Sequence, residues 1–255
     1  MGNDVSPFDL SGATALVTGA SRGIGRAIAL GLAAAGADVA GLARTEPALL
    51  ELGEQIETLG RGFLAVPADV SDPGATQTAV DRIWAWRGRI DVLVNAAGVI
   101  VRRDPPGVTP DEFDAVFGTN VRGTFFLTQA VGARMLEAGG GSIVNVASLA
   151  GEVVTGAAVT YQASKAAVIQ MTRALAVRWA PGVRVNAVGP GYIRTSLNSA
   201  WLEDPENLRY VTERTPLGRV GTPEDVVGAV VFFASPASAF VTGQHLLVDG
   251  GWSAQ

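Results

Sequence analysis

Short apolar segments rich in β-branched residues alternate with longer segments of helical spacing along this chain. The apolar segments are continuous rather than alternating in polarity, which is typical of parallel strands covered on both faces. Seven strands are predicted in this way, at residues 14–19, 38–43, 62–70, 91–98, 142–148, 183–191 and 245–251. The pattern predicts an α/β fold, a doubly wound parallel sheet of about seven strands with helices on both faces.

Three helix starts are marked by residues that cap free backbone N–H groups. Thr109-Pro110-Asp111-Glu112 has the pattern of a capping box with proline at the first helical position. Thr222-Pro223-Glu224-Asp225 repeats it, and Asp72-Pro73 opens another helix. We find no internal repeat, low-complexity segment or linker, so a single domain over residues 1–255 is predicted.

The composition excludes several classes of site. The chain has no cysteine and one histidine, His245, which excludes disulfides, thiolate metal sites and polyhistidine metal sites. We therefore predict no metal, and a structural role for His245. The net charge of −5 gives no reason to expect a nucleic acid or an anionic membrane as partner. The longest apolar run is too short to span a bilayer and no secretory signal is evident, so a cytoplasmic location is expected.

A glycine cluster, TGASRGIG, lies between the first predicted strand and an Ala/Leu-rich helix. Gly19, Gly23 and Gly25 allow a tight turn that brings a helix N-terminus close to a pyrophosphate. Their spacing differs from the G-x-G-x-x-G fingerprint, and glycines that serve only a turn are the alternative. We predict a Rossmann-type dinucleotide site, to which Ser21, Arg22 and Ile24 of the same loop also contribute.

An arginine rather than a carboxylate follows the second predicted strand. Enzymes that use NAD often place an acidic residue there, which binds the ribose hydroxyls. In this chain the strand ends at Ala43 and is followed by Arg44, while Arg22 lies in the glycine loop. Two guanidinium groups at this corner suit a 2′-phosphate, which arginine can bind in a bidentate manner. NADP is therefore the preferred cofactor, with NAD as the alternative.

Five motifs occur in one order along the chain: TGASRGIG, NAAG (residues 95–98), Ser148, YQASK (residues 161–165) and PGYIRT (residues 190–195). Together they resemble the short-chain dehydrogenase/reductase family over essentially the whole chain. The resemblance implies an NAD(P)-dependent oxidoreductase that moves a hydride between nicotinamide and a carbonyl/secondary-alcohol pair. A nucleotide-binding protein without catalysis would have no chemical need for Ser148, Tyr161 and Lys165. A relative of the extended type would need a larger C-terminal domain.

The resemblance also implies a role for each matching residue. Tyr161 would be the general acid/base, assisted by Lys165, and Ser148 would donate a hydrogen bond to the substrate oxygen. Asn120 would support a water relay to the lysine; a buried amide satisfied by the backbone is the alternative. Tyr161 and Lys165 would also touch the cofactor, whose other contacts would be Asp69 and Val70 at the adenine, Asn95 and Gly98 at its middle, and Ile193 and Thr195 at the nicotinamide amide.

The spacing of Tyr161 and Lys165 explains how a phenol could act as a base. Residues four apart lie on one face of a helix. A free phenol has a pKa of about 10, and lowering it by ~3 units takes roughly 4 kcal/mol. One ammonium at about 4 Å supplies energy of that order at an effective dielectric near 20. We therefore expect Lys165, together with oxidised nicotinamide, to lower the pKa of Tyr161.

The variable segment at residues 196–216 is expected to form a lid over the nicotinamide. The chain from residue 214 onward and the VIVRRD segment (residues 99–104) are similar to those of gluconate- and deoxygluconate-type sugar-acid dehydrogenases. A small sugar-acid or polyol-like substrate is therefore favoured. The alternative is a 3-oxoacyl-carrier-protein reductase, whose acidic partner would need a basic docking surface. Residues 174–182, where that surface is expected, carry only Arg178.

Arg102 and Arg103 follow the NAAG motif at the carboxyl end of the fourth predicted strand, where cofactor and substrate must meet. A guanidinium group binds a carboxylate in planar, bidentate fashion. Two solvated loop charges are the alternative. We expect at least one of these arginines to anchor an anionic small-molecule substrate. The family resemblance further implies a homotetramer.

Overall fold

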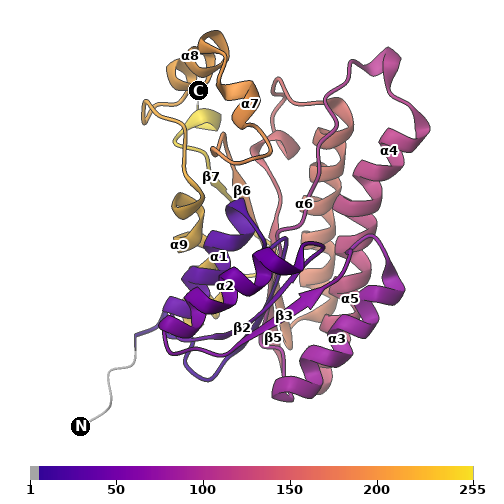
Figure 1. Cartoon of the computed structure of the whole chain (residues 1–255), viewed down its shortest axis with the longest axis vertical. Helices are drawn as coiled ribbons and strands as arrows, with labels where there is room; N and C mark the ends of the chain where they lie inside the picture. The colour runs from indigo at the N-terminus through magenta and orange to yellow at the C-terminus, as the bar shows by residue number, and fades with distance from the viewer. Residues whose placement is uncertain (1–5, 255) are drawn as a thin grey trace.

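The structure, a computed structural model that describes residues 6–254, is built on one sheet of seven parallel strands (Figure 1). The spatial order is β3-β2-β1-β4-β5-β6-β7. After β3 the chain therefore returns to the middle of the sheet, where β4 pairs with β1. This confirms the predicted doubly wound fold. Ligands bind such sheets outside the carboxyl ends of the strands at this switch point. The strands are β1 (Thr14–Thr18), β2 (Asp38–Ala43), β3 (Phe63–Pro67), β4 (Val92–Asn95), β5 (Gly141–Val146), β6 (Val183–Pro190) and β7 (His245–Val248).

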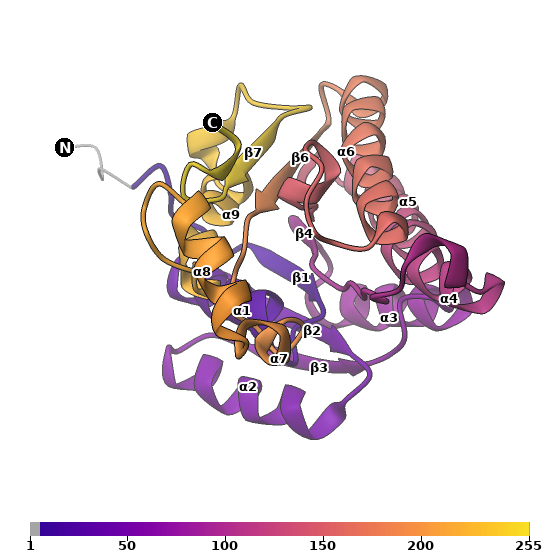
Figure 2. The same cartoon turned by 90° about the horizontal axis from the view of Figure 1, so that it is seen from above.

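Helices cover both faces of the sheet, as seen from above in Figure 2. One face carries α1 (Gly23–Ala34), α2 (Glu46–Thr58) and α9 (Pro223–Ala234), and the other carries α3 (Pro73–Arg87), α5 (Thr124–Glu137) and α6 (Val159–Trp179). Each face has its own apolar core, and neighbouring residues of β1 show the division. Val17 packs into the core with α1 and α9, whereas Leu16 packs into the core with α3 and α5. Burial on both faces explains why the strand sequences are continuously apolar.

The predicted helix starts are all present. Asp72 accepts hydrogen bonds from the N–H groups of Gly74 at 2.8 Å and Ala75 at 3.2 Å at the start of α3. Thr109 and Glu112 form the capping box that begins α4 (Pro110–Phe117). At the start of α9, Asp225 accepts from the backbone N–H of Thr222 at 2.7 Å. These caps satisfy backbone groups that a helix leaves free at its first turn.

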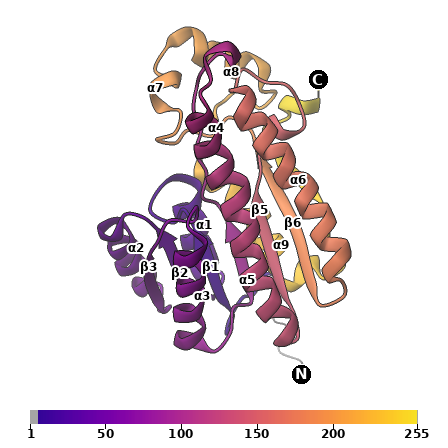
Figure 3. The same cartoon turned by 90° about the vertical axis from the view of Figure 1, so that its right-hand side faces the viewer.

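A π-helix at Gly118–Gly123 joins α4 to α5 and was not predicted from the sequence. In Figure 3, α4 and α5 run on as one long rod beside α6. The wider turn of the π-helix carries Asn120, which is 1% exposed. A side chain at Gly123 would lie 2.5 Å from the carbonyl oxygen of Val70, so this glycine lets the rod approach the loop after β3.

Two short helices, α7 (Ser199–Leu202) and α8 (Pro205–Arg214), lie above the carboxyl edge of the sheet (Figure 1). The observed β3 and β4 end before the predicted segments do. Their missing ends, residues 68–70 and 96–98, are loops at this same edge. Within residues 6–254 no helix is both long enough and apolar enough to cross a membrane.

Candidate active site

Two adjoining cavities open at the carboxyl edge of the sheet, and we call them the cofactor cleft and the substrate pocket. The cofactor cleft is lined by the glycine loop and by the ends of β2, β3 and β4. It brings together most of the residues predicted to bind the cofactor: Gly19, Ser21, Arg22, Gly23, Ile24, Gly25, Arg44, Asp69, Val70, Gly98 and Thr195. The substrate pocket contains Ser148, Tyr161, Lys165 and Ile193.

The glycine loop has the form that a pyrophosphate requires. Gly19 has a φ of +66°, and a side chain at Gly25 would lie 2.4 Å from the carbonyl oxygen of Gly19. Both positions therefore need glycine. Arg22 precedes α1 without a side-chain cap, and the first turn of α1 has no acidic residue. The N–H groups and the positive end of the dipole are thus open to an anion, so the loop fits a dinucleotide.

Arg44 and Asp69, which are predicted to lie at the adenosine half of the cofactor, face each other in the cleft. The Arg44 Nη1 and Asp69 Oδ2 atoms are 3.8 Å apart, and the Arg44 side chain is 68% exposed. Burial acts to raise the pKa of Asp69, but hydrogen bonds from Ser71 and the charge of Arg44 outweigh it and hold the pKa below its usual value. So loose and exposed a pair leaves the Arg44 guanidinium free to turn toward a phosphate.

Asn95 does not line the cofactor cleft, in contrast to the expectation from the NAAG motif. Its amide nitrogen donates to Thr128 Oγ1 at 2.9 Å and to Asn145 Oδ1 at 2.8 Å inside the sheet. As the last residue of β4, Asn95 points into the packed layer under α5. The loop after it is held instead by Thr18 Oγ1, which accepts from the N–H groups of Ala96 and Ala97, each at 3.0 Å.

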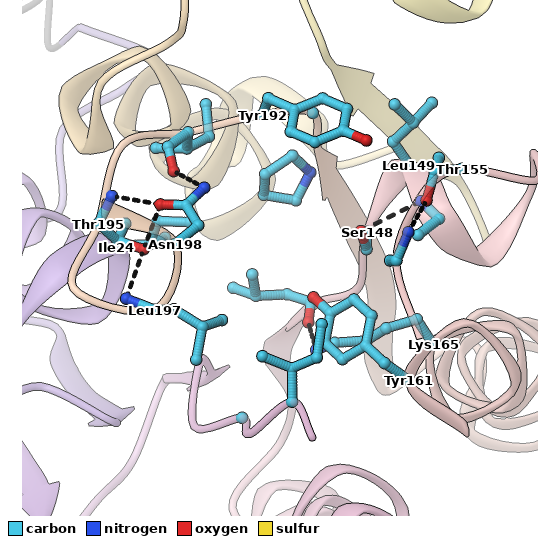
Figure 4. A pocket seen from close by; sticks show the side chains of 18 of the residues that line it. Ile24, Ser148, Leu149, Thr155, Tyr161, Lys165, Tyr192, Thr195, Leu197 and Asn198 are labelled. Carbon is cyan, nitrogen blue, oxygen red and sulfur yellow. Dashed lines mark hydrogen bonds between the residues drawn. The ribbon is translucent and has the colours of Figure 1, made fainter. Parts of the chain in front are cut away.

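Ser148, Tyr161 and Lys165 meet in the substrate pocket (Figure 4). Ser148 follows β5 and accepts from the N–H of Ala150 at 3.1 Å, which begins a short 3₁₀ turn at Leu149–Gly151. Tyr161 and Lys165 come from the first two turns of α6, on one face as predicted. The Lys165 Nζ atom lies 5.7 Å from the centroid of the Tyr161 ring.

Lys165 is the only lysine in the chain, and it is 5% exposed. Its Nζ donates to the carbonyl oxygen of Val146 at 2.7 Å, at the end of β5. Burial disfavours the charged ammonium and lowers the pKa of Lys165 to about 8. A side chain at Gly98 would lie 3.6 Å from this Nζ, so the glycine of the NAAG motif lies directly beside the lysine.

The pKa of Tyr161 is raised by the surrounding protein, and the lowering expected from Lys165 together with oxidised nicotinamide stays a prediction. Burial is the largest cause and raises it, while the Ser148 hydroxyl and the charge of Arg102 act to lower it. Desolvation disfavours the phenolate for the same reason that it disfavours the ammonium of Lys165. The protein therefore favours the protonated phenol, and positive charge beyond that of Arg102 would help to turn it into a base.

Asn120 is held by protein groups on both sides. Its Oδ1 accepts from the N–H of Val99 at 2.8 Å, and its Nδ2 donates to the carbonyl oxygen of Val99 at 3.0 Å and to Ser164 Oγ at 3.0 Å. This is the buried amide that we considered as the alternative. Asn120 ties the loop after β4 to α6 one residue before Lys165, and the water relay stays a prediction.

The turn with Ile193 and Thr195, the residues predicted to contact the nicotinamide, is held by a residue that the sequence did not single out. Asn198 Oδ1 accepts from the N–H of Thr195 at 2.9 Å, and its Nδ2 donates to the carbonyl oxygen of Ile193 at 2.9 Å. Asn198 therefore holds the turn that presents the predicted contacts Ile193 and Thr195. The substrate pocket also includes Thr155, Tyr192 and Trp201, which we had not assigned. The sequence indicated these residues only weakly, because Thr155 and Trp201 lie in segments without a motif.

His245 lies outside the cluster, in β7. Its imidazole is 2% exposed, and its Nδ1 lies 3.0 Å from Glu152 Oε1, which follows the 3₁₀ turn after Ser148. The histidine thus links the last strand to the segment that presents Ser148. Within residues 6–254 no group of three His, Cys, Asp or Glu side chains is arranged to hold a metal ion.

The sheet order, the open N-terminus of α1 and the grouping of Ser148, Tyr161 and Lys165 define a nucleotide-dependent oxidoreductase of the doubly wound class. A family model described as Enoyl-(Acyl carrier protein) reductase matches residues 19–253. The chain belongs to the short-chain dehydrogenase/reductase family, as its motifs predicted. The expectation of an NAD(P)-dependent enzyme is thereby confirmed.

Similar proteins match over nearly their full length. The chain is 38% identical to 2-dehydro-3-deoxy-D-gluconate 5-dehydrogenase of Dickeya dadantii, over 98% of this chain and 99% of that protein. It is 40% identical to D-threitol dehydrogenase of Mycolicibacterium smegmatis, over 96% and 95%. A gluconate 5-dehydrogenase of Burkholderia cenocepacia, solved in complex with NADP and tartrate, is 37% identical and superposes with a TM-score of 0.94 over 98% of each chain.

We expect Lys165 to titrate near pH 8 in the native protein, because its ammonium is desolvated. Protein labelled with ¹³Cε-lysine should give a single lysine signal, whose midpoint is read by NMR between pH 6 and 10. In urea the same lysine should return to about 10.4, the value of an exposed amine. A native midpoint above 10 would show that the ammonium is solvated and would contradict the buried site.

Proposed function

We propose that this enzyme interconverts a secondary hydroxyl and a ketone on a small sugar acid or polyol, with NADP as the preferred cofactor. The observation that carries the substrate class is the presence of Arg102 in the wall of the pocket that contains Tyr161. Relatives named for gluconate, deoxygluconate and polyols support the same class. The tartrate bound to the relative from Burkholderia cenocepacia is itself a small hydroxy acid.

Arg102 and Arg103 differ in what already occupies their guanidinium groups. Arg103 Nε donates to Glu112 Oε1 at 3.1 Å, and this pairing raises the pKa of Arg103. Arg102 donates a long hydrogen bond from Nη1 to the carbonyl oxygen of Leu197 at 3.4 Å, and its positive charge acts to lower the pKa of Tyr161 and of Tyr192 in the pocket. We assign the substrate carboxylate to Arg102, whereas Arg103 is paired with Glu112 of the α4 capping box.

The three residues around the reacting carbon divide the proton chemistry. In reduction, Tyr161 donates its proton to the developing alkoxide, and Ser148 donates a hydrogen bond to the same oxygen. In oxidation, the phenolate takes the hydroxyl proton while the carbon loses a hydride. Bound nicotinamide supplies the hydride acceptor or donor. Lys165 holds a positive charge beneath the phenol and lowers the cost of forming the phenolate.

Reduction of a 3-oxoacyl group on a carrier protein is less well supported. A 3-oxoacyl thioester has no charged group beside its ketone, so it offers no partner for Arg102. Residues 174–182, at the end of α6 and just after it, carry Arg178 as their only positive charge. One positive charge gives a weak docking surface for an acidic carrier protein. We further propose that residues 196–216 act as a lid, that the enzyme is a homotetramer, and that it works in the cytoplasm.

Arg102→Ala should raise the Michaelis constant for D-gluconate at least about tenfold, because a bidentate charged contact is worth about 1.5–3 kcal/mol. The constant for galactitol, a neutral polyol of equal length, should change little. Arg103→Ala is the matched control and should leave both constants unchanged. Steady-state kinetics of the wild type and of the two variants make the comparison. Equal effects of Arg102→Ala on both substrates would contradict a contact between Arg102 and the substrate carboxylate.

Tyr161→Phe should lower kcat by at least about 100-fold, the range over which general acid/base groups act. Phenylalanine keeps the ring volume, so NADP binding measured by calorimetry should be nearly unchanged. A decrease of less than tenfold with a confirmed substrate would assign the proton transfer to another group.

Arg44→Asp should turn the cofactor preference from NADP toward NAD, because a carboxylate repels a 2′-phosphate. The dissociation constant for NADP should rise at least about tenfold. Arg82→Asp makes the same charge change on an exposed site of α3 and serves as control. The assignment would be wrong if calorimetry found the wild type tighter for NAD.

A further inference from the structure

Tyr192 presents a buried hydroxyl to the substrate pocket. It lies two residues after β6 and lines the pocket with Ser148 and Tyr161. In Figure 4 its phenol oxygen points across the upper part of the pocket toward the loop with Thr155. The Thr155 hydroxyl and the Gly156 N–H lie close enough to act on the pKa of Tyr192 and to lower it, but neither meets the Tyr192 oxygen in hydrogen-bond geometry, nor does any other group of the described residues. A buried hydroxyl without a hydrogen bond is unfavourable in free energy, so this site is suited to a hydrogen-bond partner on a bound ligand.

The ring of Tyr192 is fixed by an aromatic stack. It lies 5.8 Å from the ring of Trp201 with 20° between the planes, and 4.8 Å from the ring of Trp252. Tyr210 contacts Trp252 at 5.6 Å. These partners come from α7, from the C-terminal 3₁₀ turn and from α8. Ring contacts from two segments, with Tyr210 supporting Trp252, hold the phenol in one orientation, which is the condition for a specific hydrogen bond.

The hydroxyl can act as a donor throughout the physiological range. Burial is the largest influence on Tyr192 and raises its pKa, so the phenol stays protonated. Trp201 lines the same pocket and adds apolar aromatic surface to it. A hydroxyl donor in a pocket with aromatic surface matches a polyhydroxylated carbon chain, which has acceptor oxygens and C–H groups on neighbouring carbons.

We propose that Tyr192 is a specificity-determining residue whose hydroxyl bonds a substrate hydroxyl remote from the reacting carbon. This inference rests on the proposed substrate class. In this arrangement Arg102 binds the substrate carboxylate. Ser148 and Tyr161 contact the reacting oxygen, and Tyr192 contacts a hydroxyl farther along the substrate. Three separated contacts fix both the position and the handedness of a substrate.

Tyr192→Phe removes only the hydroxyl and keeps the stack. The Michaelis constants for D-gluconate and galactitol should rise about tenfold with kcat little changed, the value of one hydrogen bond to a buried group. Tyr210→Phe is the matched control, because it deletes the same group from the same stack outside the pocket. It should leave the kinetics unchanged, and thermal unfolding should show both variants folded.

Deoxy substrates identify the contacted hydroxyl. With wild-type enzyme, one of 2-deoxy- and 3-deoxy-D-gluconate should lose about as much kcat/KM as the Tyr192→Phe substitution causes, and in the variant that deoxygenation should have no further effect. Additive losses, or unchanged kinetics of Tyr192→Phe on D-gluconate and galactitol, would overturn the assignment while leaving the proposed function standing. A wild type that oxidises neither a sugar acid nor a polyol would overturn the proposed function itself.

Discussion

Backbone groups at the carboxyl edge of the parallel sheet lose their ladder partners, and the side chains that satisfy them build the site. Thr18 accepts two N–H groups of the loop after β4. Lys165 donates to the carbonyl oxygen of Val146 at the end of β5, and Asn120 bonds both backbone groups of Val99. Each of these bonds joins segments far apart in sequence. The need to satisfy the edge thus positions the groups that do the chemistry.

Burial at this edge also determines the resting protonation of the site. It raises the pKa of Tyr161 and lowers that of Lys165 to about 8, because both shifts favour the neutral form. Near neutral pH the phenol is protonated and ready to act as an acid, which suits ketone reduction. Alcohol oxidation needs the phenolate, so positive charge must be brought close. Arg102 already acts in that direction, and a cationic nicotinamide would add to it.

The fold and the core of the site could be predicted because their signals are local. Continuous apolar runs, caps and the Tyr161–Lys165 spacing depend on a few neighbouring residues. The features that the sequence did not show depend on long-range partners. Asn95 turned away from the cleft because Thr128 and Asn145 lie within reach of its amide, and the burial that raises the pKa of Tyr161 comes from the whole pocket. Neither partnership is visible in sequence spacing.

The groups that act on the reacting carbon and the groups that contact the rest of the substrate come from different parts of the structure. Lys165 and Tyr161 lie on α6, which packs against the sheet and cannot shift without disturbing the core. Arg102, Tyr192 and Trp201 lie in segments beyond the strand ends. Such segments tolerate change because few core contacts depend on them. The aromatic stack of Tyr192, Trp201 and Trp252 gives these segments the rigidity that selectivity requires. It does so without altering the sheet or the residues that transfer the proton.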